Sequence, residues 1–179
     1  MKVEKGGRRT HFFGSIVSVY QPSGRTTMFL VVDGQQRLTT VSLLLLAIRN
    51  LLKAGKVDSE DPNLAQRIYE EYLVDRFHPE ATRIKLKPGQ NDREAFSKLF
   101  GEESKRVVDS QITKNYDYFV QRILANEITV DEIVEAIEKL LSFGEWHEPD
   151  SGRQRRLLPR QCLGEMQCYE TGTVWISGA

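Results

Sequence analysis

The sequence comprises 179 residues, of which 40% are hydrophobic and 28% are charged. These values are typical of one globular domain with a core of its own. The 25 basic and 25 acidic residues cancel, which excludes an overall electrostatic attraction to DNA or to a membrane surface. The longest apolar run, residues 41–48, is far shorter than the roughly 20 residues that cross a bilayer, and no signal peptide is recognisable. We expect a bacterial cytoplasmic protein with no membrane partner.

The first predicted elements are a β-hairpin and a helix. Residues 12–20 are rich in β-branched and aromatic side chains, residues 21–24 are typical of a turn, and residues 28–32 again favour a strand. This second strand runs directly into the segment Asp33-Gly34-Gln35-Gln36-Arg37, after which a helix is predicted over residues 38–53. Apolar residues cover nearly the whole circumference of that helix, so we expect it to lie at the centre of the core.

Shorter elements are predicted next. Asp61-Pro62 favours the start of a helix that reaches about Leu73, because aspartate caps helices and proline fits their first turn. Residues 83–86 alternate like a short strand, and another short helix is expected to begin near Asp92 and to bury Phe96.

Two longer helices are predicted from their capping residues. Ser110 is placed to cap a helix that carries Tyr116 and other apolar residues on one face. Thr129 and Glu132 have the spacing of a capping box, and the apolar face of the helix they open continues to Leu141.

The character of the sequence changes after Phe143. Residues 143–179 hold both tryptophans and both cysteines and show neither helical nor strand periodicity. We expect an irregular tail, which is either an ordinary extension or a stretch read in an altered frame. Residues 1–142 form the predicted domain, with a core segment over 12–55 and a helical part over 56–142. The predicted fold class is α+β, in which the hairpin and a few short strands pack on a buried helix.

The turn between the second strand and the helix is the strongest candidate site. Such a turn presents unpaired backbone N–H groups and the positive end of the helix dipole, which suit a phosphate group. Gly34 permits close approach, Arg37 offers a charged fork to phosphate oxygens, and Asp33 offers a ligand for Mg²⁺. Gln35 and Gln36 are suited to positioning the ligand or a water molecule. The plainer alternative is that Asp33 only caps the helix and Arg37 only pairs with a surface carboxylate.

The same segment carries a family resemblance. Phe12-Phe13-Gly14-Ser15-Ile16-Val17, the stretch from Val31 to Thr40 with its DGQQR core, and the leucine-rich helix that follows resemble the N-terminal domain of GmrSD-type restriction endonucleases. That family is similar in fold to ParB and sulfiredoxin and is implicated in defence against phage with modified DNA, a type IV restriction activity. The resemblance implies a nucleotide-hydrolysing component whose turnover is coupled to DNA cleavage.

The resemblance also implies roles for individual residues. Asp33, Gln36 and Arg37 are expected to be catalytic, and Asp33 is expected to hold Mg²⁺. The residues expected to bind the nucleoside triphosphate are Gly34, Gln35, Arg37 and Thr39.

Two stretches that are usual in the family are not found in the sequence. They are an upstream Ile-Pro-x-Tyr-Gln-Arg segment and a downstream His-Asn-His nuclease domain. We therefore expect an incomplete copy, shortened at both ends, that engages modified DNA through the full-length system with a nuclease domain or subunit in trans. The alternative is a non-catalytic remnant or a ParB-like module that binds DNA or a partner.

Overall fold

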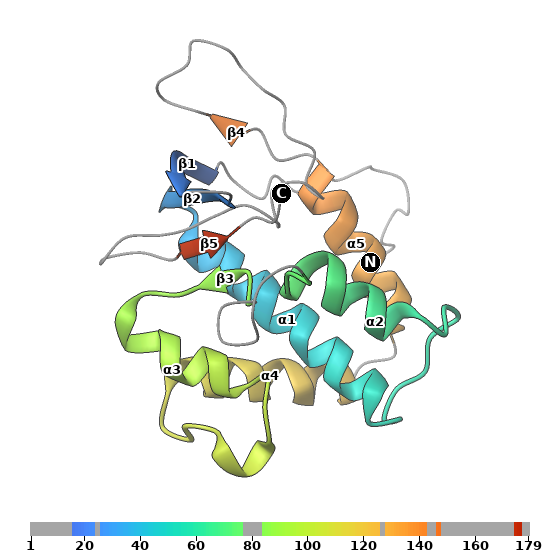
Figure 1. Ribbon diagram of the computed structural model, residues 1–179. Coiled ribbons are helices and arrows are strands. Elements are labelled where there is room, and N and C mark those ends of the chain that lie inside the picture. Colours follow the sequence, from blue (N-terminus) through green and yellow to red (C-terminus); the bar gives the residue numbers. More distant parts are fainter. Residues whose placement is uncertain are drawn as a thin grey trace, which may run out of the picture.

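The computed structural model describes residues 16–23, 26–76, 84–125, 128–142, 146–147 and 174–176. These residues make an α+β fold, which confirms the predicted class. The strands are β1 (Ile16–Ser23), β2 (Thr26–Asp33), β3 (Leu86–Lys87), β4 (Trp146–His147) and β5 (Val174–Ile176). The α-helices are α1 (Gln35–Lys53), α2 (Leu64–Ile68), α3 (Gln90–Lys98), α4 (Gln111–Ala125) and α5 (Val130–Ser142). The strands lie at the N-terminal end of α1, and the other helices lie along its remaining length (Figure 1).

β1 and β2 form the predicted antiparallel hairpin. Their pairing extends to Ser23 and Thr26, so only residues 24–25 separate the two strands. The turn predicted over residues 21–24 was therefore placed too early. Pro22 is tolerated inside β1 because, among the described residues, the outer edge of this strand pairs with β4 only at the opposite end of β1.

Three short strands extend the hairpin into a five-stranded sheet with the order β3-β5-β2-β1-β4. β5 lies antiparallel between β2 and β3, and β4 lies parallel to β1. Both β4 and β5 belong to residues 143–179, which were expected to be irregular, so two short parts of that segment are strands. The other residues of the segment lie outside the described part of the chain.

α1 is the central helix of the core, as its apolar circumference predicts. It contacts α2, α4 and α5, and ten of its residues are buried. Leu46, Ala47 and Ile48 have no exposed surface at all. Because burial of one aliphatic side chain stabilises a fold by about 1.5–3 kcal/mol, this helix contributes a large part of the packing energy.

The helix predicted between Asp61 and Leu73 has two parts. α2 is followed without a break by a π-helical turn, η1 (Tyr69–Leu73), in which the Val74 N–H donates to the carbonyl oxygen of Tyr69 at 2.9 Å. The predicted end at Leu73 is correct, whereas α2 itself begins only at Leu64. Apolar periodicity does not distinguish an α-helical from a π-helical turn, so the sequence did not reveal η1.

Lys85 lies against this π-helical turn. Its Nζ donates hydrogen bonds to the carbonyl oxygens of Glu71 at 2.8 Å and Glu70 at 3.3 Å. Burial lowers the pKa of Lys85, and the nearby carboxylates of Asp75 and Glu71 offset part of that effect. The ammonium thus satisfies backbone acceptors that the last turn of a helix leaves without a helical partner.

The capping residues predicted for α4 and α5 are confirmed. The Ile112 N–H donates to Ser110 Oγ at 3.2 Å, ahead of α4. At the start of α5, the Glu132 N–H donates to Thr129 Oγ1 at 3.2 Å and the Thr129 N–H donates to Glu132 Oε2 at 3.0 Å, which is a reciprocal capping box. A 3₁₀ turn, η2 (Glu103–Lys105), lies between α3 and α4.

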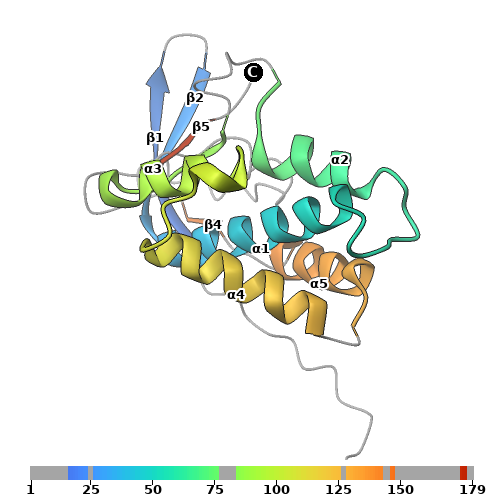
Figure 2. The ribbon, with the colours of Figure 1, turned by 90° about the horizontal axis from the view of Figure 1, so that it is seen from below.

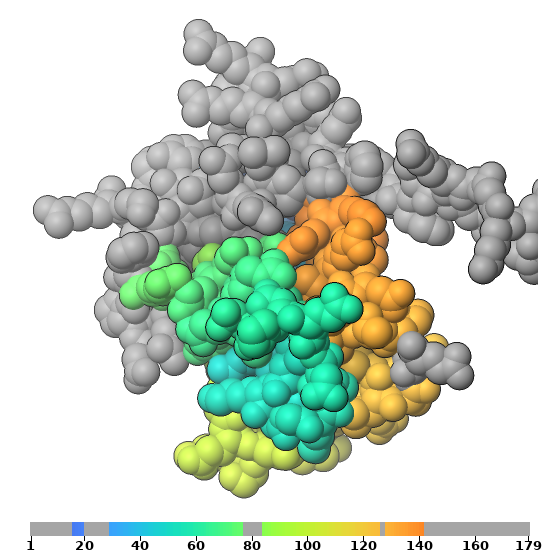
Figure 3. Space-filling view, turned by 90° about the vertical axis from the view of Figure 1, so that its right-hand side faces the viewer, coloured from blue at the N-terminus to red at the C-terminus, as the bar shows by residue number. Residues whose placement is uncertain are grey.

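Polar side chains join α5 to the segment around α2. Arg67 of α2 forms an ion pair with Glu138 at 2.8 Å, and Ser59 donates a hydrogen bond to Asp131 at 2.6 Å. Figure 3 looks onto this face, where α2 in green lies beside α5 in orange. The helices around α1 are therefore held together by side-chain bonds as well as by the shared core.

Candidate functional site

A single residue, Gly34, makes the corner between β2 and α1. β2 ends at Asp33 and α1 begins at Gln35, three residues earlier than the predicted start at Leu38. The Gln-Gln-Arg part of the motif therefore forms the first turn of the helix. Gly34 has a φ of 91°, a left-handed conformation that only glycine adopts at low cost.

The Gly34 position is close to β1. A Cβ atom at Gly34 would lie 2.8 Å from Cγ1 of Ile16, well inside van der Waals contact. Gly34 was expected to let a phosphate group approach, but the close approach that the structure shows is to Ile16. Gly34 therefore has a packing role, because it lets α1 leave the sheet directly beside the first strand.

A β-bulge lies just before the corner. Val17 pairs with Asp33 and the next residue of β1, Ser18, pairs with Val31, so Val32 is the extra residue on β2. Strict alternation would place Asp33 on the same buried side as Val31. Val32 is 59% exposed, as alternation predicts, but the Asp33 side chain is also exposed, at 63%. The bulge thus turns the Asp33 carboxylate toward solvent, and bulges often redirect side chains in this way.

Three side chains of α1 share the exposed side of the corner with Asp33. Gln36, Arg37 and Thr40 follow one another at helical spacing, and all three reach solvent. Arg37 Nη2 lies 3.3 Å from Asp33 Oδ2, and the Arg37 side chain is 34% exposed. Thr40 Oγ1 donates to the carbonyl oxygen of Gln36 at 2.7 Å. Thr40 was not among the predicted site residues, although its spacing of four residues from Gln36 places it on this face.

The other two predicted ligand-binding residues lie elsewhere. Gln35 Nε2 donates to the carbonyl oxygens of Val31 at 2.9 Å and Val32 at 3.5 Å, so its amide holds the end of β2 against the first turn of α1. Thr39 is buried on the core side of the helix. The structure therefore brings Asp33, Gln36 and Arg37 together, and it separates Gln35 and Thr39 from them.

The N-terminus of α1 suits an anion electrostatically. Gly34 cannot make a side-chain cap bond, and the first turn contains no acidic residue. Asp33 does not cap the helix, whereas Arg37 does pair with an exposed carboxylate, that of Asp33, as the plainer alternative predicts. An α-helix carries about half a positive charge at its N-terminus, where the first backbone N–H groups have no helical acceptor. Arg37 adds a positive charge beside this end, and the Asp33 carboxylate, 3.3 Å from Arg37, offsets it until a cation binds there.

The fit of these residues to Mg²⁺ depends on Asp33. Within the described residues, no group of three or more aspartate, glutamate, histidine or cysteine side chains is placed to hold a metal ion. Mg²⁺ is usually bound in nucleotide sites by one or two carboxylates together with phosphate oxygens and water. The exposed Asp33 carboxylate fits that role as the single protein ligand, with the remaining ligands coming from a nucleotide.

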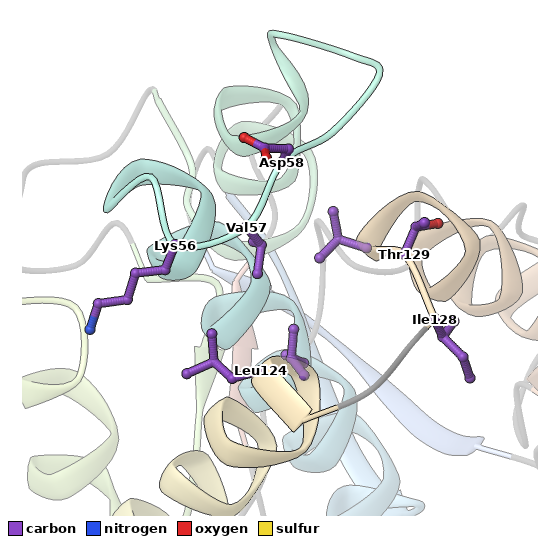
Figure 4. A pocket seen from close by; sticks show the side chains of 8 residues that line it. Lys56, Val57, Asp58, Leu124, Ile128 and Thr129 are labelled. Atoms are coloured by element: carbon purple, nitrogen blue, oxygen red, sulfur yellow. The ribbon is translucent and has the colours of Figure 1, made fainter.

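A hollow of about 270 Å³ lies at the opposite end of α1 (Figure 4). It lies between the residues that follow α1 and the facing ends of α4 and α5, and apolar side chains such as Val57, Leu124 and Ile128 line it. The 19 residues of α1 span about 28 Å at 1.5 Å per residue. The hollow is therefore separate from the corner at Asp33.

Comparisons with known proteins assign the chain to a family. A family model described as the GmrSD restriction endonuclease N-terminal domain matches residues 3–166. No curated protein matches the chain. The matched residues include the Asp33 corner and α1 to α5, and they extend beyond the domain boundary predicted after residue 142. That boundary, and the expected shortening at both ends, stay predictions.

In the described part of the chain, none of the helices is long and apolar enough to cross a membrane. The match to the family model spans far more than half of the 179 residues. It includes the segment on which the resemblance rests, and the structure places that segment at a strand-to-helix corner with three exposed polar side chains. The chain belongs to the family of GmrSD restriction endonuclease N-terminal domains.

Proposed function

We propose that this chain is the nucleotide-binding and nucleotide-hydrolysing component of a modification-dependent DNA restriction system. Membership of a restriction endonuclease family supports the DNA restriction part of the proposal. One observation carries the nucleotide part: Asp33, Gln36 and Arg37 reach solvent together at an α1 N-terminus that lacks an acidic first turn. Hydrolysis of a nucleotide needs an anion cradle, a charge stabiliser and a metal ligand, and these residue types supply them.

Each side chain has a role that follows from its position. The first backbone N–H groups of α1 and the Arg37 guanidinium would bind phosphate oxygens, because both carry positive charge and Arg37 lies in the first turn of the helix. Asp33 would hold Mg²⁺, which neutralises charge on the transferred phosphoryl group. Gln36 would orient the attacking water, since its amide both donates and accepts hydrogen bonds.

The ion pair between Arg37 and Asp33 is compatible with ligand exchange. Arg37 Nη2 and Asp33 Oδ2 lie 3.3 Å apart, and the two side chains are 34% and 63% exposed. Surface pairs of this kind stabilise a protein by only about 0–1 kcal/mol. A phosphate group near Arg37 and a cation near Asp33 could therefore replace the pair at small cost.

The rest of the motif favours a purely structural role. Gly34 packs against Ile16, and Gln35 bonds to the carbonyl oxygens at the end of β2. The alternative function, a non-catalytic remnant or a DNA- or partner-binding module, extends this structural role to the whole motif. The two functions differ in one property, which is nucleotide binding by the exposed residues.

Nucleotide binding is measured by titrating fluorescent ATP and GTP analogues with the full chain, in the presence and absence of Mg²⁺. We expect Arg37→Ala to weaken binding about 10- to 150-fold, because a charge-assisted hydrogen bond contributes about 1.5–3 kcal/mol. Asp33→Asn should reduce the dependence of binding on Mg²⁺, and Gln36→Ala should lower phosphate release more than affinity. Arg122→Ala, which removes an exposed arginine from α4, is the matched control.

Circular dichroism should show the same helical content in all four variants, because the altered side chains are at least partly exposed. Equal affinity of the wild type, Arg37→Ala and Asp33→Asn would refute the proposed site. A wild-type chain that binds neither analogue would favour the structural alternative.

A further inference from the structure

The first residue of α1 reaches back across the corner to the end of β2. The side-chain amide of Gln35 donates to the carbonyl oxygen of Val31 at 2.9 Å and, in a longer contact, to that of Val32 at 3.5 Å. In Figure 2, α1 leaves the base of the hairpin that β1 and β2 form. The Gln35 side chain therefore links the first turn of the helix to the strand, over the two residues between them, Asp33 and Gly34.

The two carbonyl oxygens belong to the β-bulge. Val32 is the extra residue on β2, between the residues that pair with Ser18 and Val17 of β1. The extra residue of a bulge is left out of the hydrogen-bond ladder, so its backbone groups need other partners. Gln35 supplies a donor at this point, because it lies only three residues after Val32.

The hydrogen bonds of Gln35 fix the direction of Asp33. A peptide group is planar, so the carbonyl oxygen of Val32 and the Cα atom of Asp33 belong to one rigid unit. The preceding peptide group carries the carbonyl oxygen of Val31, which accepts the shorter of the two bonds. On the other side, Gly34 has a φ of 91°. Asp33 is therefore held on both sides, with its side chain 63% exposed.

The amide of Gln35 has no donor left for a phosphate group. A glutamine amide carries two N–H donors and one acceptor oxygen. Two strand carbonyls accept hydrogen bonds from Nε2, so the oxygen is the group that remains. Phosphate oxygens are themselves acceptors and gain nothing from a second acceptor. Gln35 thus does not suit the direct nucleotide contact that the family resemblance implies for it.

We propose that Gln35 is a positioning residue for Asp33: its amide holds the bulge that turns the Asp33 carboxylate outward, and it does not bind the nucleotide itself. Residues that orient a metal ligand affect metal affinity although they do not touch the metal. The inference rests on the proposed function, in which Asp33 holds Mg²⁺. α1 keeps its place without this amide, because ten of its residues are buried. Loss of the amide should therefore move Asp33 and leave Arg37 where it is.

The test replaces Gln35 by methionine, which removes both donors and keeps a similar side-chain length and helix propensity. The full chain is titrated with a fluorescent ATP analogue with and without Mg²⁺, and the ratio of the two affinities is the Mg²⁺ gain. Gln35→Met should lower this gain about 10-fold, the lower end of the range for residues that orient a metal ligand, since Gly34 still holds Asp33. The affinity without Mg²⁺ should equal that of the wild type, because Arg37 and the first N–H groups of α1 are unchanged.

Gln111→Met is the matched control. Gln111 is likewise the first residue of a helix, α4, and its amide donates to Asn115 at 2.9 Å. This variant should leave the Mg²⁺ gain unchanged. The double variant Asp33→Asn/Gln35→Met tests whether Gln35 acts through Asp33, because without the carboxylate the loss of the amide should lower the gain no further. A role in stability alone would not produce this coupling.

NMR relaxation of backbone ¹⁵N nuclei tests the hold on Asp33 without any nucleotide. A rigid backbone position has an order parameter of about 0.85, and a flexible one falls below about 0.6. We expect Gln35→Met to lower the order parameters of Val32 and Asp33 toward the flexible range. Gln111→Met should leave both at their wild-type values.

Three results would overturn the proposal. They are an equal loss of affinity with and without Mg²⁺, which would indicate direct contact with the nucleotide, an unchanged Mg²⁺ gain, and an unchanged order parameter at Asp33. A wild-type chain that binds no nucleotide would instead refute the proposed function. The order parameters would then still decide whether Gln35 holds Asp33, so the two proposals fail on different measurements.

Discussion

Replacement of Gly34 by alanine should destabilise the fold strongly, because two separate costs meet at this residue. The first is conformational: with φ at 91°, a Cβ atom costs about 1–2 kcal/mol in the left-handed region. The second is steric, since the new Cβ would lie 2.8 Å from Ile16 Cγ1 and 3.3 Å from Ile16 Cα. Overpacking of this kind costs about 1–3 kcal/mol. The expected loss in the free energy of unfolding is therefore about 2–5 kcal/mol.

Gly55 provides a matched control. It also has a positive φ, 63°, but nothing lies within 4 Å of a Cβ built there. Gly55→Ala should therefore show only the conformational cost of about 1–2 kcal/mol. The difference between the two variants isolates the contact between the corner and β1.

Urea denaturation followed by circular dichroism gives the free energies of unfolding of both variants. For a chain of this size, each kcal/mol also lowers the melting temperature by about 2–4 °C. A double-mutant cycle with Ile16→Ala tests the steric part, because removal of Cγ1 should make Gly34→Ala less costly than it is in the wild type. Equal losses in Gly34→Ala and Gly55→Ala, or no coupling between Gly34 and Ile16, would refute the argument.

Three further predictions concern the helices. Leu45→Ala should lower the free energy of unfolding by about 2–5 kcal/mol, because Leu45 is only 1% exposed. The same substitution at the partly buried Leu52 should lower it less. A loss within experimental error at Leu45 would contradict the central position of α1. Thr129→Ala removes the cap of α5 and should cost about 0.5–2 kcal/mol by urea denaturation, and no measurable loss would mean that the box is dispensable. Burial holds the pKa of Lys85 below its ordinary value of 10.5. Between the lowered pKa and 10.5, the folded state therefore binds fewer protons than the unfolded state. The stability of the wild type should rise with pH over this range. Lys85→Met should show a smaller rise in pH-dependent denaturation, because Lys87, whose pKa is also lowered by burial, still contributes. Parallel curves for the two proteins would refute the assignment.

Local patterns in the sequence predicted much of the fold. The hairpin, the buried central helix, the Ser110 cap and the Thr129 capping box were all recognised, because each depends on residues within a few positions of one another. The resemblance around the DGQQR segment predicted the family that the comparison confirms. Of the candidate site residues, Asp33, Gln36 and Arg37 were named together, and the structure places them on one exposed face.

Features that depend on distant residues were not predicted. β5 pairs with both β2 and β3. Strands of two or three residues are too short to show an alternating pattern in the sequence, so they could not be predicted from it. The π-helical turn before Val74 differs from an α-helix by one hydrogen-bond step, which leaves the apolar pattern unchanged. Thr39 was expected at the site because of its place in the motif, but its direction depends on where α1 begins.

The sequence by itself determined which side chains are available near the corner, that a strand leads into a helix there, and that this helix is buried. Only the tertiary structure decided how those side chains are used. Packing of Gly34 against Ile16 sets the start of α1, and the extra residue Val32 turns Asp33 outward to the side of Arg37. Both effects arise from the pairing of β2 with β1, because the register between two strands is a relation between segments and is not encoded at any one position.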